Sequence, residues 1–370
     1  MKNEFDILPL KDWLKLEGSP LIISGPCSAE SREQVLSTAR QLKKIPEVRI
    51  FRAGIWKPRT RPGSFEGVGE KGLKWLREVK EETGLLTTVE VANPKHVELA
   101  LKNDVDILWV GARTVVNPFS LQELASVLQG VNIPVMVKNP VNPDIGLWAG
   151  AIERMALSGI NKLVAIHRGF YFFNKTPFRN APMWEIPIEL KRRIPNLPII
   201  CDPSHICGKR ELLKDVAQKA LDLEMDGLMI ESHINPDKAL TDPQQQITPS
   251  ELKTLLGSLV SRKPQGNIEF ETKLEKLRSE IDKIDAELIG ILSRRMGIID
   301  EIGAYKSQNN ITILQLKRWR QIVEDRLGAG LESGLEGDFL QKLLEIVHVE
   351  SIRRQTEIYK QSNGRKNTNL

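Results

Sequence analysis

The chain has 370 residues, of which 41% are hydrophobic and 27% are charged, a composition typical of a soluble globular protein of about two domains. Its formal net charge of +5 suits acidic small-molecule substrates, and the spread of its cations through periodic segments argues against a nucleic-acid-binding block. We expect neither a signal peptide nor a membrane helix, because no run approaches the roughly 18 apolar residues of a membrane span. Three cysteines without a CxxC pair argue against disulfides and a structural zinc site, and favour a reducing cytoplasm.

Short apolar runs alternate with amphipathic stretches up to residue 262. Eight of these runs are apolar on both faces, as expected of parallel strands that are covered on both sides: 20–26, 48–54, 85–91, 106–112, 134–139, 162–169, 197–203 and 227–232. Helical patterns lie between them, and this alternation over about 250 residues predicts an α/β fold, a (β/α)₈ barrel, for residues 1–262. An open doubly wound sheet is the alternative, but the chain lacks its Gly-rich dinucleotide fingerprint.

The pattern changes after residues 263–269, which we interpret as a linker. From Leu274 onward, apolar residues follow a 3,4 spacing that predicts one helix of about 35 residues, and further helical patterns cover 314–327 and 338–360. Residues 270–360 are therefore predicted to form a small all-α domain that gains stability by pairing with a second copy. We expect residues 361–370 to be a disordered tail.

Polar residues follow nearly every predicted strand of the barrel. Functional residues of such barrels gather at the C-terminal ends of the strands, so these side chains are predicted to share one rim. Any one of them is more often a solvated loop residue or an apolar filler, but their coincidence at one rim favours a function. One group consists of cations that repel one another unless they bind an anion such as a phosphate or carboxylate: Arg52, Lys57, Arg59, Arg113, Lys138 and Arg168. The other group can hold a transition metal such as Mn²⁺, Fe²⁺, Co²⁺ or Zn²⁺: Cys27, His205, Glu231 and Asp242.

The segments GPCS, RAGIWKPRT, GAR, DPSHICGKR and ESHINPDKALTDPQQQ resemble the shorter, type I beta-like sub-class of 3-deoxy-D-arabino-heptulosonate-7-phosphate synthases over about residues 15–262. The resemblance implies a metal-dependent condensation of phosphoenolpyruvate with erythrose 4-phosphate at the start of the shikimate pathway. It makes the metal ligands Cys27, His205, Glu231 and Asp242, and we expect Mn²⁺ first. It assigns to phosphoenolpyruvate Arg52, Lys57, Arg113, Lys138 and Arg168, and to the phosphate of erythrose phosphate Arg59 and Thr60. Lys57 is also placed to donate a proton near the aldehyde.

Two motifs depart from that family. It usually has Lys-Arg-Gly after the fifth strand and Cys-Glu-Arg-Gly after the sixth, whereas this chain has KNP at 138–140 and IHRG at 166–169. Both keep the cation, and they leave the neighbouring contacts and the role of His167 open. A sibling family that uses arabinose 5-phosphate shares the fold and the metal site but lacks the KPRT run. The KPRT run therefore favours the four-carbon aldose.

An arginine interrupts the apolar stripe of the long predicted helix. Arg295 stands where a Leu or Ile is expected, and a cation on an apolar stripe must meet an anion or extend to solvent. Lys306 lies three turns further on and points almost the same way. Arg278 lies about 25 Å before Arg295 along the axis and about 100° around it, so only a symmetric partner brings it to the same ligand.

Residues 277–306, QLKRW at 315–319 and ESIRRQ at 350–355 resemble the all-helical chorismate mutases, over about residues 270–358. The resemblance implies an intertwined homodimer that rearranges chorismate to prephenate without a cofactor. It assigns to the chorismate site Arg278 from the partner chain, Arg295, Lys306, Arg318, Ser351 and Gln355. Gln315 and Trp319 stand where the family often has Asp and Glu beside the substrate hydroxyl, so affinity or rate is expected to differ.

The whole chain is therefore predicted to be a bifunctional enzyme. The helical domain is also predicted to bind prephenate or chorismate and to lower the synthase activity by allosteric linkage. One alternative makes this domain a sensor and dimeriser without catalysis. A second makes it a nucleic-acid-binding domain, which the lack of a basic block and a reading motif disfavours.

Overall fold

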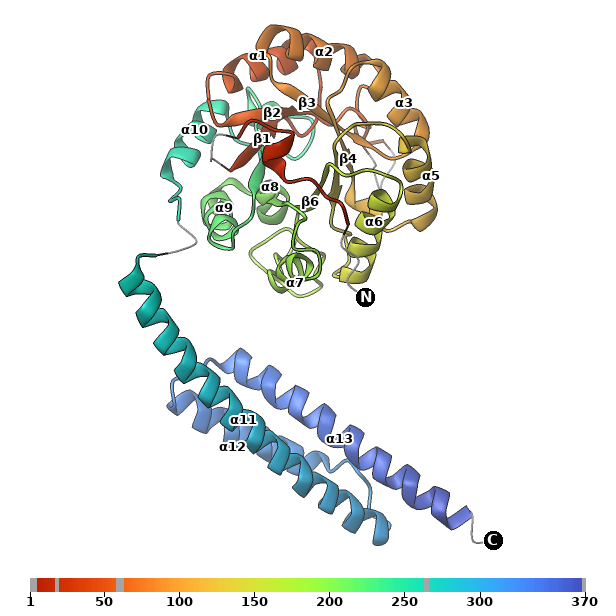
Figure 1. Cartoon of the computed structure of the whole chain (residues 1–370), viewed down its shortest axis with the longest axis vertical. Helices are drawn as coiled ribbons and strands as arrows, with labels where there is room; N and C mark the ends of the chain where they lie inside the picture. Colours follow the sequence, from red (N-terminus) through yellow and green to blue (C-terminus); the bar gives the residue numbers. More distant parts are fainter. Residues whose placement is uncertain (1–4, 17–19, 58–62, 263–265, 368–370) are drawn as a thin grey trace. The chain divides into compact units, whose positions relative to one another are not determined.

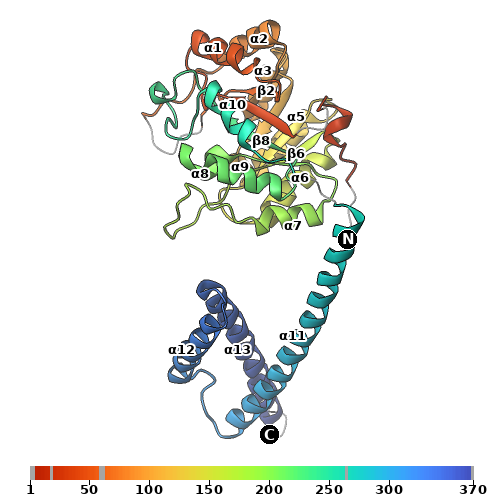
Figure 2. The same cartoon turned by 90° about the vertical axis from the view of Figure 1, so that its left-hand side faces the viewer.

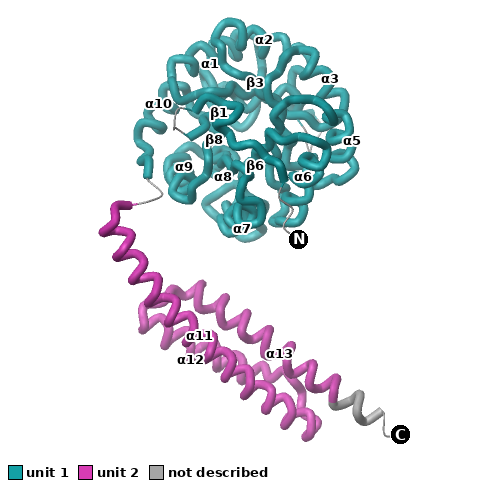
Figure 3. Tube along the Cα trace, viewed as in Figure 1, with its two compact units in different colours: residues 1–264 teal, residues 265–370 magenta. Residues whose placement is uncertain are grey.

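A computed structural model describes residues 5–16, 20–57, 63–262 and 266–367, except for the side chains of 362–367. The chain divides into two compact units, Met1–Pro264 and Gln265–Leu370 (Figures 1 and 3). The first contains all the strands of the described residues, and the second is helical. Within the described residues, no helix has the length and apolar character needed to cross a membrane.

The first unit is a closed barrel of parallel strands arranged in chain order, which confirms the predicted (β/α)₈ architecture (Figure 1). Each strand coincides with one of the predicted apolar runs, and most strand residues are buried because helices cover the outer face and side chains fill the interior. The strands are β1 Leu21–Gly25, β2 Val48–Arg52, β3 Leu86–Val91, β4 Ile107–Val110, β5 Val135–Lys138, β6 Leu163–His167, β7 Ile199–Cys201 and β8 Gly227–Glu231.

The barrel closes where β1 pairs with β8 in an unbroken register from Leu21 opposite Gly227 to Gly25 opposite Glu231. Gly25 has a φ of +148°, and a Cβ atom there would lie 2.0 Å from the carbonyl oxygen of Arg52. Only glycine therefore allows the end of β1 to pass so close to the end of β2. This approach brings the segment after β1 next to the ends of β2 and β8.

Helices surround the strands (Figure 1). Side chains cap several of their N-termini: the Ser31 hydroxyl accepts from Gln34 N, and Thr248 and Glu251 form a capping box. The helices are α1 Arg32–Leu42, α2 Lys71–Thr83, α3 Pro94–Lys102, α4 Ala112–Val115, α5 Pro118–Leu128, α6 Ile145–Leu157, α7 Glu185–Arg193, α8 Pro203–Cys207, α9 Leu213–Asp222 and α10 Pro249–Ser258, with 3₁₀ turns η1 Leu10–Asp12, η2 Arg210–Leu212 and η3 Pro236–Lys238.

The N-terminal segment covers the end of the barrel at which the strands begin. Leu10 and Leu14 are buried in one cluster with Leu21 and Ile50 from the strands, and Leu8 N donates to the carbonyl oxygen of Asn161 just before β6. Apolar side chains therefore fill this end. The opposite end, at the C-terminal ends of the strands, carries the polar side chains.

The second unit consists of α11 Ile268–Gln308, α12 Leu316–Glu332 and α13 Gly337–Asn367 (Figure 2). The long helix starts earlier than the predicted 274, and within the predicted linker, because Asn267 Oδ1 caps it by accepting from Phe270 N at 2.9 Å. Residues 361–367, which we expected to be disordered, continue α13 as helical backbone. Most of the apolar stripe of α11 is exposed: Leu277, Ile281, Ile284, Leu288 and Ile291.

Candidate active sites

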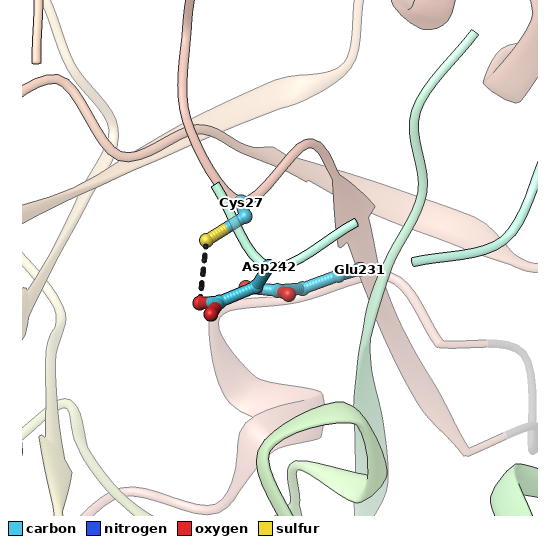
Figure 4. Close-up of side chains that lie close together, drawn as sticks. All are labelled: Cys27, Glu231 and Asp242. Atoms are coloured by element: carbon cyan, nitrogen blue, oxygen red, sulfur yellow. Dashed lines mark hydrogen bonds between the residues drawn. The ribbon is translucent and has the colours of Figure 1, made fainter. Parts of the chain in front are cut away.

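Three of the predicted metal ligands converge at the C-terminal end of the barrel (Figure 4). Cys27 follows β1, Glu231 ends β8, and Asp242 lies in the loop after β8; one ligand atom from each lies within 4.8 Å of the others. The Cys27 thiol donates a hydrogen bond to Asp242 Oδ2 at 3.3 Å. The closing register of β1 and β8 produces this arrangement, because it places the ends of the two strands side by side.

His205 approaches the same group from α8. Its Nε2 lies 3.7 Å from Glu231 Oε1, and its Nδ1 lies 2.8 Å from Asp202 Oδ2. Asp202 is the N-cap of α8, since its Oδ1 accepts from His205 N at 3.1 Å. Burial lowers the pKa of His205, despite the nearby Asp202 carboxylate. Nδ1 lies close to this carboxylate but makes no hydrogen bond among the described residues, and Nε2 lies on the side of the ligand group, where it could bind a metal.

The protonation of Cys27 fits a site that is completed by a cation. Burial, followed by the negative charge of Glu231, raises the pKa of the thiol to about 11, although Lys57 acts in the opposite direction. The thiol is therefore protonated, in agreement with its hydrogen bond to Asp242. A divalent cation would reverse this balance and favour the thiolate. The donor set of thiolate, imidazole and two carboxylates fits a transition metal.

Two of the predicted cations lie directly beside these ligands. Arg52 is buried, and its Nη1 donates to Glu231 Oε1 at 2.7 Å while its Nη2 donates to the Cys27 carbonyl oxygen at 3.1 Å. Its guanidinium carbon also lies 5.0 Å from the centre of the Trp109 ring. Lys57 Nζ lies 3.0 Å from the Cys27 carbonyl oxygen and 3.1 Å from its sulfur. The metal group and the cation group thus form one site.

The remaining described cations follow neighbouring strands. Lys138 Nζ donates to Asp202 Oδ2 at 2.8 Å, and both side chains are buried. Burial lowers the pKa of Arg168 to about 10, and the positive charges of Arg179 and Arg113 act in the same direction. A bound anion would offset this mutual repulsion. Arg59 and Thr60 lie outside the described residues.

His167 does not join this cation group. Its imidazole is completely buried among aromatic rings, with centroids 5.2 Å from Trp184, 5.8 Å from Phe170 and 6.3 Å from Trp148. Neither ring nitrogen has a hydrogen-bond partner among the described residues. Burial, with a smaller effect of Arg168, lowers its pKa to about 3. The position before Arg168 therefore carries a buried ring whose burial favours the neutral form.

Some side chains of the site were missed by sequence reasoning. Gln246 Oε1 accepts from Cys27 N at 2.8 Å, and Gln245 Nε2 donates to Glu231 Oε2 at 2.7 Å. Arg179 and Asn180, in the loop between β6 and α7, also contact the site. The run DPQQQ after β8 was a signal for the glutamines, whereas nothing in the loop sequence distinguished Arg179 from a solvated arginine.

In the helical unit, three predicted residues come together between α11 and α13. Arg295 Nη1 donates to the Ser351 hydroxyl at 2.8 Å, and Gln355 lies one turn further along α13 and is buried. The Gln355 Oε1 atom is buried without a hydrogen-bond partner among the described residues. A Cβ atom at Gly303 would lie 3.1 Å from Gln355 Cγ, so a glycine here allows the two helices to approach closely.

The other predicted residues of this unit make different contacts. Lys306 Nζ donates to the Ile313 carbonyl oxygen at 2.7 Å and lines a hollow of about 540 Å³ together with Gln315. Arg318 Nη1 donates to Gln321 Oε1 on its own helix. Arg278 is exposed, and its nearest acid is Glu275, with Nη1 and Oε2 3.8 Å apart. Trp319 stacks on His348 at 3.7 Å between ring centroids.

Comparison with known families agrees with this geometry. The model of the DAHP synthetase I family matches residues 10–265, which is more than half of the chain. The chain belongs to the DAHP synthetase I family. In this family member, the model of chorismate mutase type II matches residues 277–356, so the helical unit is a chorismate mutase domain fused to a DAHP synthase domain.

Curated relatives of this DAHP synthetase I family member support the barrel assignment. A phospho-2-dehydro-3-deoxyheptonate aldolase of Thermotoga maritima is 35% identical over 248 residues, which are 66% of this chain and 70% of the relative. A 2-dehydro-3-deoxyphosphooctonate aldolase of Desulfotalea psychrophila is 28% identical over 270 residues, which are 67% of this chain and 92% of the relative. The higher identity is to the heptonate enzyme.

Two solved structures of DAHP synthases from Thermotoga maritima are similar to this chain. One, a phospho-2-dehydro-3-deoxyheptonate aldolase, has a TM-score of 0.61 and 33% identity, and covers 69% of this chain and 72% of that chain. The other, a truncated form of the 3-deoxy-D-arabino-heptulosonate 7-phosphate synthase, has a TM-score of 0.56 and 31% identity, with 64% and 83% covered.

Proposed function

We propose that the barrel condenses phosphoenolpyruvate with erythrose 4-phosphate to 3-deoxy-D-arabino-heptulosonate 7-phosphate and phosphate, with the help of a divalent metal ion, Mn²⁺ first among Fe²⁺, Co²⁺ and Zn²⁺. The observation that carries this proposal is that a group of thiol and carboxylate metal ligands lies in direct contact with cationic side chains. Cys27, Glu231 and Asp242 lie together, with Arg52 and Lys57 in direct contact with Cys27. Two phosphorylated substrates require such a concentration of positive charge.

The proposed ligands are Cys27, His205, Glu231 and Asp242, and the bound metal ion supplies a Lewis acid for the aldehyde oxygen. The buried cations at the strand ends hold the carboxylate and phosphate of phosphoenolpyruvate, so that its C3 carbon faces the aldehyde. A carbon–carbon bond forms between C3 and the aldehyde carbon, water adds to C2, and phosphate leaves from C2. Lys57, whose Nζ lies at the ligand group, donates the proton to the aldehyde oxygen.

A coupled assay of the intact protein tests this proposal. The protein is supplied with phosphoenolpyruvate and erythrose 4-phosphate, before and after treatment with a chelator, and in parallel with chorismate. We expect the chelator to abolish the synthase activity, Mn²⁺ to restore it, and the mutase activity to be unaffected. Synthase turnover that persists without any metal would contradict the metal assignment, and turnover with arabinose 5-phosphate in place of the four-carbon sugar would contradict the substrate.

We propose that the helical unit rearranges chorismate to prephenate. This reaction needs two carboxylates held in the reactive conformer and a cation at the ether oxygen as charge develops there. Arg295 suits a carboxylate, and Lys306 and Gln355 suit the ether oxygen. Burial lowers the pKa of Arg295, with the charge of Arg326 contributing, which is the expected state of a cation that awaits an anion.

We further propose that this unit forms a homodimer. The exposed apolar stripe of α11 includes Leu277, Ile281 and Ile284, which are 48%, 56% and 62% exposed. Burial of such a stripe against a second copy stabilises both copies by about 25 cal/mol per Å². The partner's copy would also supply the Arg278 side chain, which has no carboxylate closer than that of Glu275 among the described residues. Sedimentation that shows a monomer at micromolar concentration would contradict this.

We propose, finally, that prephenate bound to the helical unit lowers the synthase activity. The two domains lie on one chain, and a coupling of 1–3 kcal/mol between distinct sites is typical. The alternative, in which the helical unit only senses prephenate or chorismate, differs in one respect: the intact protein would bind chorismate without turning it over. Chorismate turnover by the intact protein separates these two cases, because only a catalytic helical unit converts chorismate to prephenate.

A further inference from the structure

Arg179, in the loop between β6 and α7, connects two residues of the metal group. Its Nη1 atom donates to Asp242 Oδ1 at 2.9 Å and to Gln245 Oε1 at 2.7 Å. Gln245 Nε2 in turn donates to Glu231 Oε2 at 2.7 Å. One guanidinium thus holds one carboxylate ligand directly and the other through a buried amide.

The next residue contacts the other half of the site. Arg168 Nη1 donates to Asn180 Oδ1 at 2.8 Å, and Asn180 Nδ2 donates to the carbonyl oxygen of His205 at 2.6 Å. Asn180 is buried, and both hydrogen bonds are partly shielded from solvent. A single amide therefore connects a cation of the proposed phosphoenolpyruvate site to the backbone of a proposed metal ligand.

The backbone of this pair is fixed to the barrel. Arg179 N donates to the Cys207 carbonyl oxygen at 3.3 Å, and Asn180 N donates to that of Ile206 at 3.1 Å, so both residues are attached to α8. A Cβ atom at Gly208, which has a φ of +68°, would lie 2.5 Å from Arg179 Cβ. Glycine at that position allows the close approach, and the two side chains start from a fixed support.

We propose that Arg179 and Asn180 are positioning residues of the synthase: Arg179 holds the carboxylates of Asp242 and Glu231 in the arrangement that the metal requires, and Asn180 holds Arg168 in the arrangement that phosphoenolpyruvate requires. This inference rests on the function proposed above for the barrel. In this arrangement, two consecutive residues connect the metal ligands to the anion-binding cation. Neither residue is assigned a contact with the reacting atoms.

A guanidinium beside a ligand carboxylate has two opposite consequences for metal affinity. If Arg179 orients Asp242 and Gln245, its removal loosens the ligands and weakens metal binding, commonly about 10–100-fold for such outer contacts. If Arg179 instead competes with the metal for Asp242, its removal strengthens binding. The direction of the change therefore decides between the two roles.

Titration of the metal-free full-length protein with Co²⁺ measures this direction, because the absorption of a cobalt–thiolate bond reports on Cys27 independently of activity. We expect Arg179→Ala to raise the dissociation constant by about 10–100-fold, and Arg179→Lys to recover part of the affinity, since lysine keeps the charge but not the fork of donors. Arg192→Ala is the matched control, because Arg192 is exposed and pairs with Glu189 on its own helix. Unchanged or tighter binding in Arg179→Ala overturns the inference.

Kinetics at saturating metal test the second half. Asn180→Ala should raise the KM for phosphoenolpyruvate about tenfold or more, the effect of losing one hydrogen bond to a charged group, and should change the KM for erythrose 4-phosphate less. Equal changes in both, or none, overturn this half. Thermal unfolding of each variant reports whether the barrel has folded. If an alanine variant fails to fold, Arg179→Gln or Asn180→Ser is measured in its place. A wild-type protein without Co²⁺ binding or synthase turnover would refute the proposed function itself, whereas a normal wild type with unaffected variants refutes only this inference.

Discussion

Arg52 and Glu231 form an ion pair that is almost completely shielded from solvent, with 2.7 Å between Nη1 and Oε1 and side-chain exposures of 2% and 0%. The pair joins the end of β2 to the end of β8 across β1. Glu231 is also a proposed metal ligand, so the same carboxylate serves an arginine and, when the metal is bound, a cation of higher charge. The stability of the metal-free barrel should therefore depend on Arg52.

Arg52→Met should destabilise the metal-free protein by about 3–5 kcal/mol, because it leaves a buried carboxylate without its partner. Chemical denaturation of the metal-free wild type and variant measures the difference. The double variant Arg52→Met/Glu231→Leu is the control, and it should regain part of the lost stability since no unpaired charge remains. A single variant as stable as the wild type would show that the carboxylate takes up a proton or water at no appreciable cost.

Cys27→Ala should abolish synthase turnover and strongly weaken metal binding, because the site loses its thiolate, while chorismate turnover continues. Activity assays with both substrate sets and a metal titration measure these effects. Cys207→Ala is the matched control, since Cys207 is also a buried free thiol but does not belong to the group of Cys27, Glu231 and Asp242. Synthase turnover retained in Cys27→Ala would refute the metal assignment.

Arg295→Ala should lower chorismate turnover by at least about 100-fold, because the loss of a charge-assisted contact that acts in the transition state removes several kcal/mol. The neighbouring Arg294 is exposed, and Arg294→Ala should retain activity. Circular dichroism distinguishes a structural role of Arg295 from a role in the chorismate site. An unfolded helical unit in Arg295→Ala would make the arginine structural, and a folded unit with full activity would exclude it from the site.

His167 should make the barrel less stable in mild acid. Its folded pKa is lowered to about 3 from an ordinary value of 6.5, so below about pH 6.5 the unfolded chain binds a proton that the folded barrel excludes. The contribution of His167 to the free energy of unfolding is constant above that pH. Below it, the contribution falls by up to about 1.4 kcal/mol per pH unit. Denaturation of metal-free His167→Leu and wild type between about pH 7 and about pH 4 should give a shallower decline in the variant. Parallel curves would contradict this account of the buried ring.

Prephenate should inhibit the synthase of the intact protein, and the inhibition should be lost in Arg295→Ala. Titration of synthase activity with prephenate measures this, with Arg294→Ala as the control that should remain inhibited. By linkage, the synthase substrates should then alter the affinity for prephenate by the same factor as prephenate alters theirs. An intact protein indifferent to prephenate would remove the regulatory proposal and leave the two catalytic ones unaffected.

The regular parts of the fold could be predicted from the sequence. Each strand of the barrel is a run that is apolar on both faces, and this signal does not depend on knowledge of its neighbours. The convergence of Cys27, Glu231 and Asp242 followed from the same pattern, because each residue lies at or after a strand end and parallel strands end on one rim. The start of α11 at Ile268 was missed because a single capping asparagine decides it.

Contacts that depend on side-chain direction could not be predicted in this way. Arg179 and Asn180 lie in a loop without periodicity, so nothing indicated that they face the site while Arg192 faces solvent. The role of His167 was left open because the IHRG run departs from the family's motif. Neighbouring positions at the end of a strand point in opposite directions, so the run itself does not tell which side chain faces the site. The structure places His167 against the ring of Trp184, whereas Arg168, one residue later, donates a hydrogen bond to Asn180.

The backbone at Asp242 limits which amino acids this position accepts. Its φ of +48° lies in the left-handed region, where most L-residues are strained by about 1–2 kcal/mol and Asp and Asn are tolerated better. A glutamate would meet both this strain and a side chain one methylene too long for the same place. Substitutions that keep the local chain path are therefore restricted to Asn and Gly, neither of which carries a charge. The turn itself thus selects the shortest acid for this corner of the site.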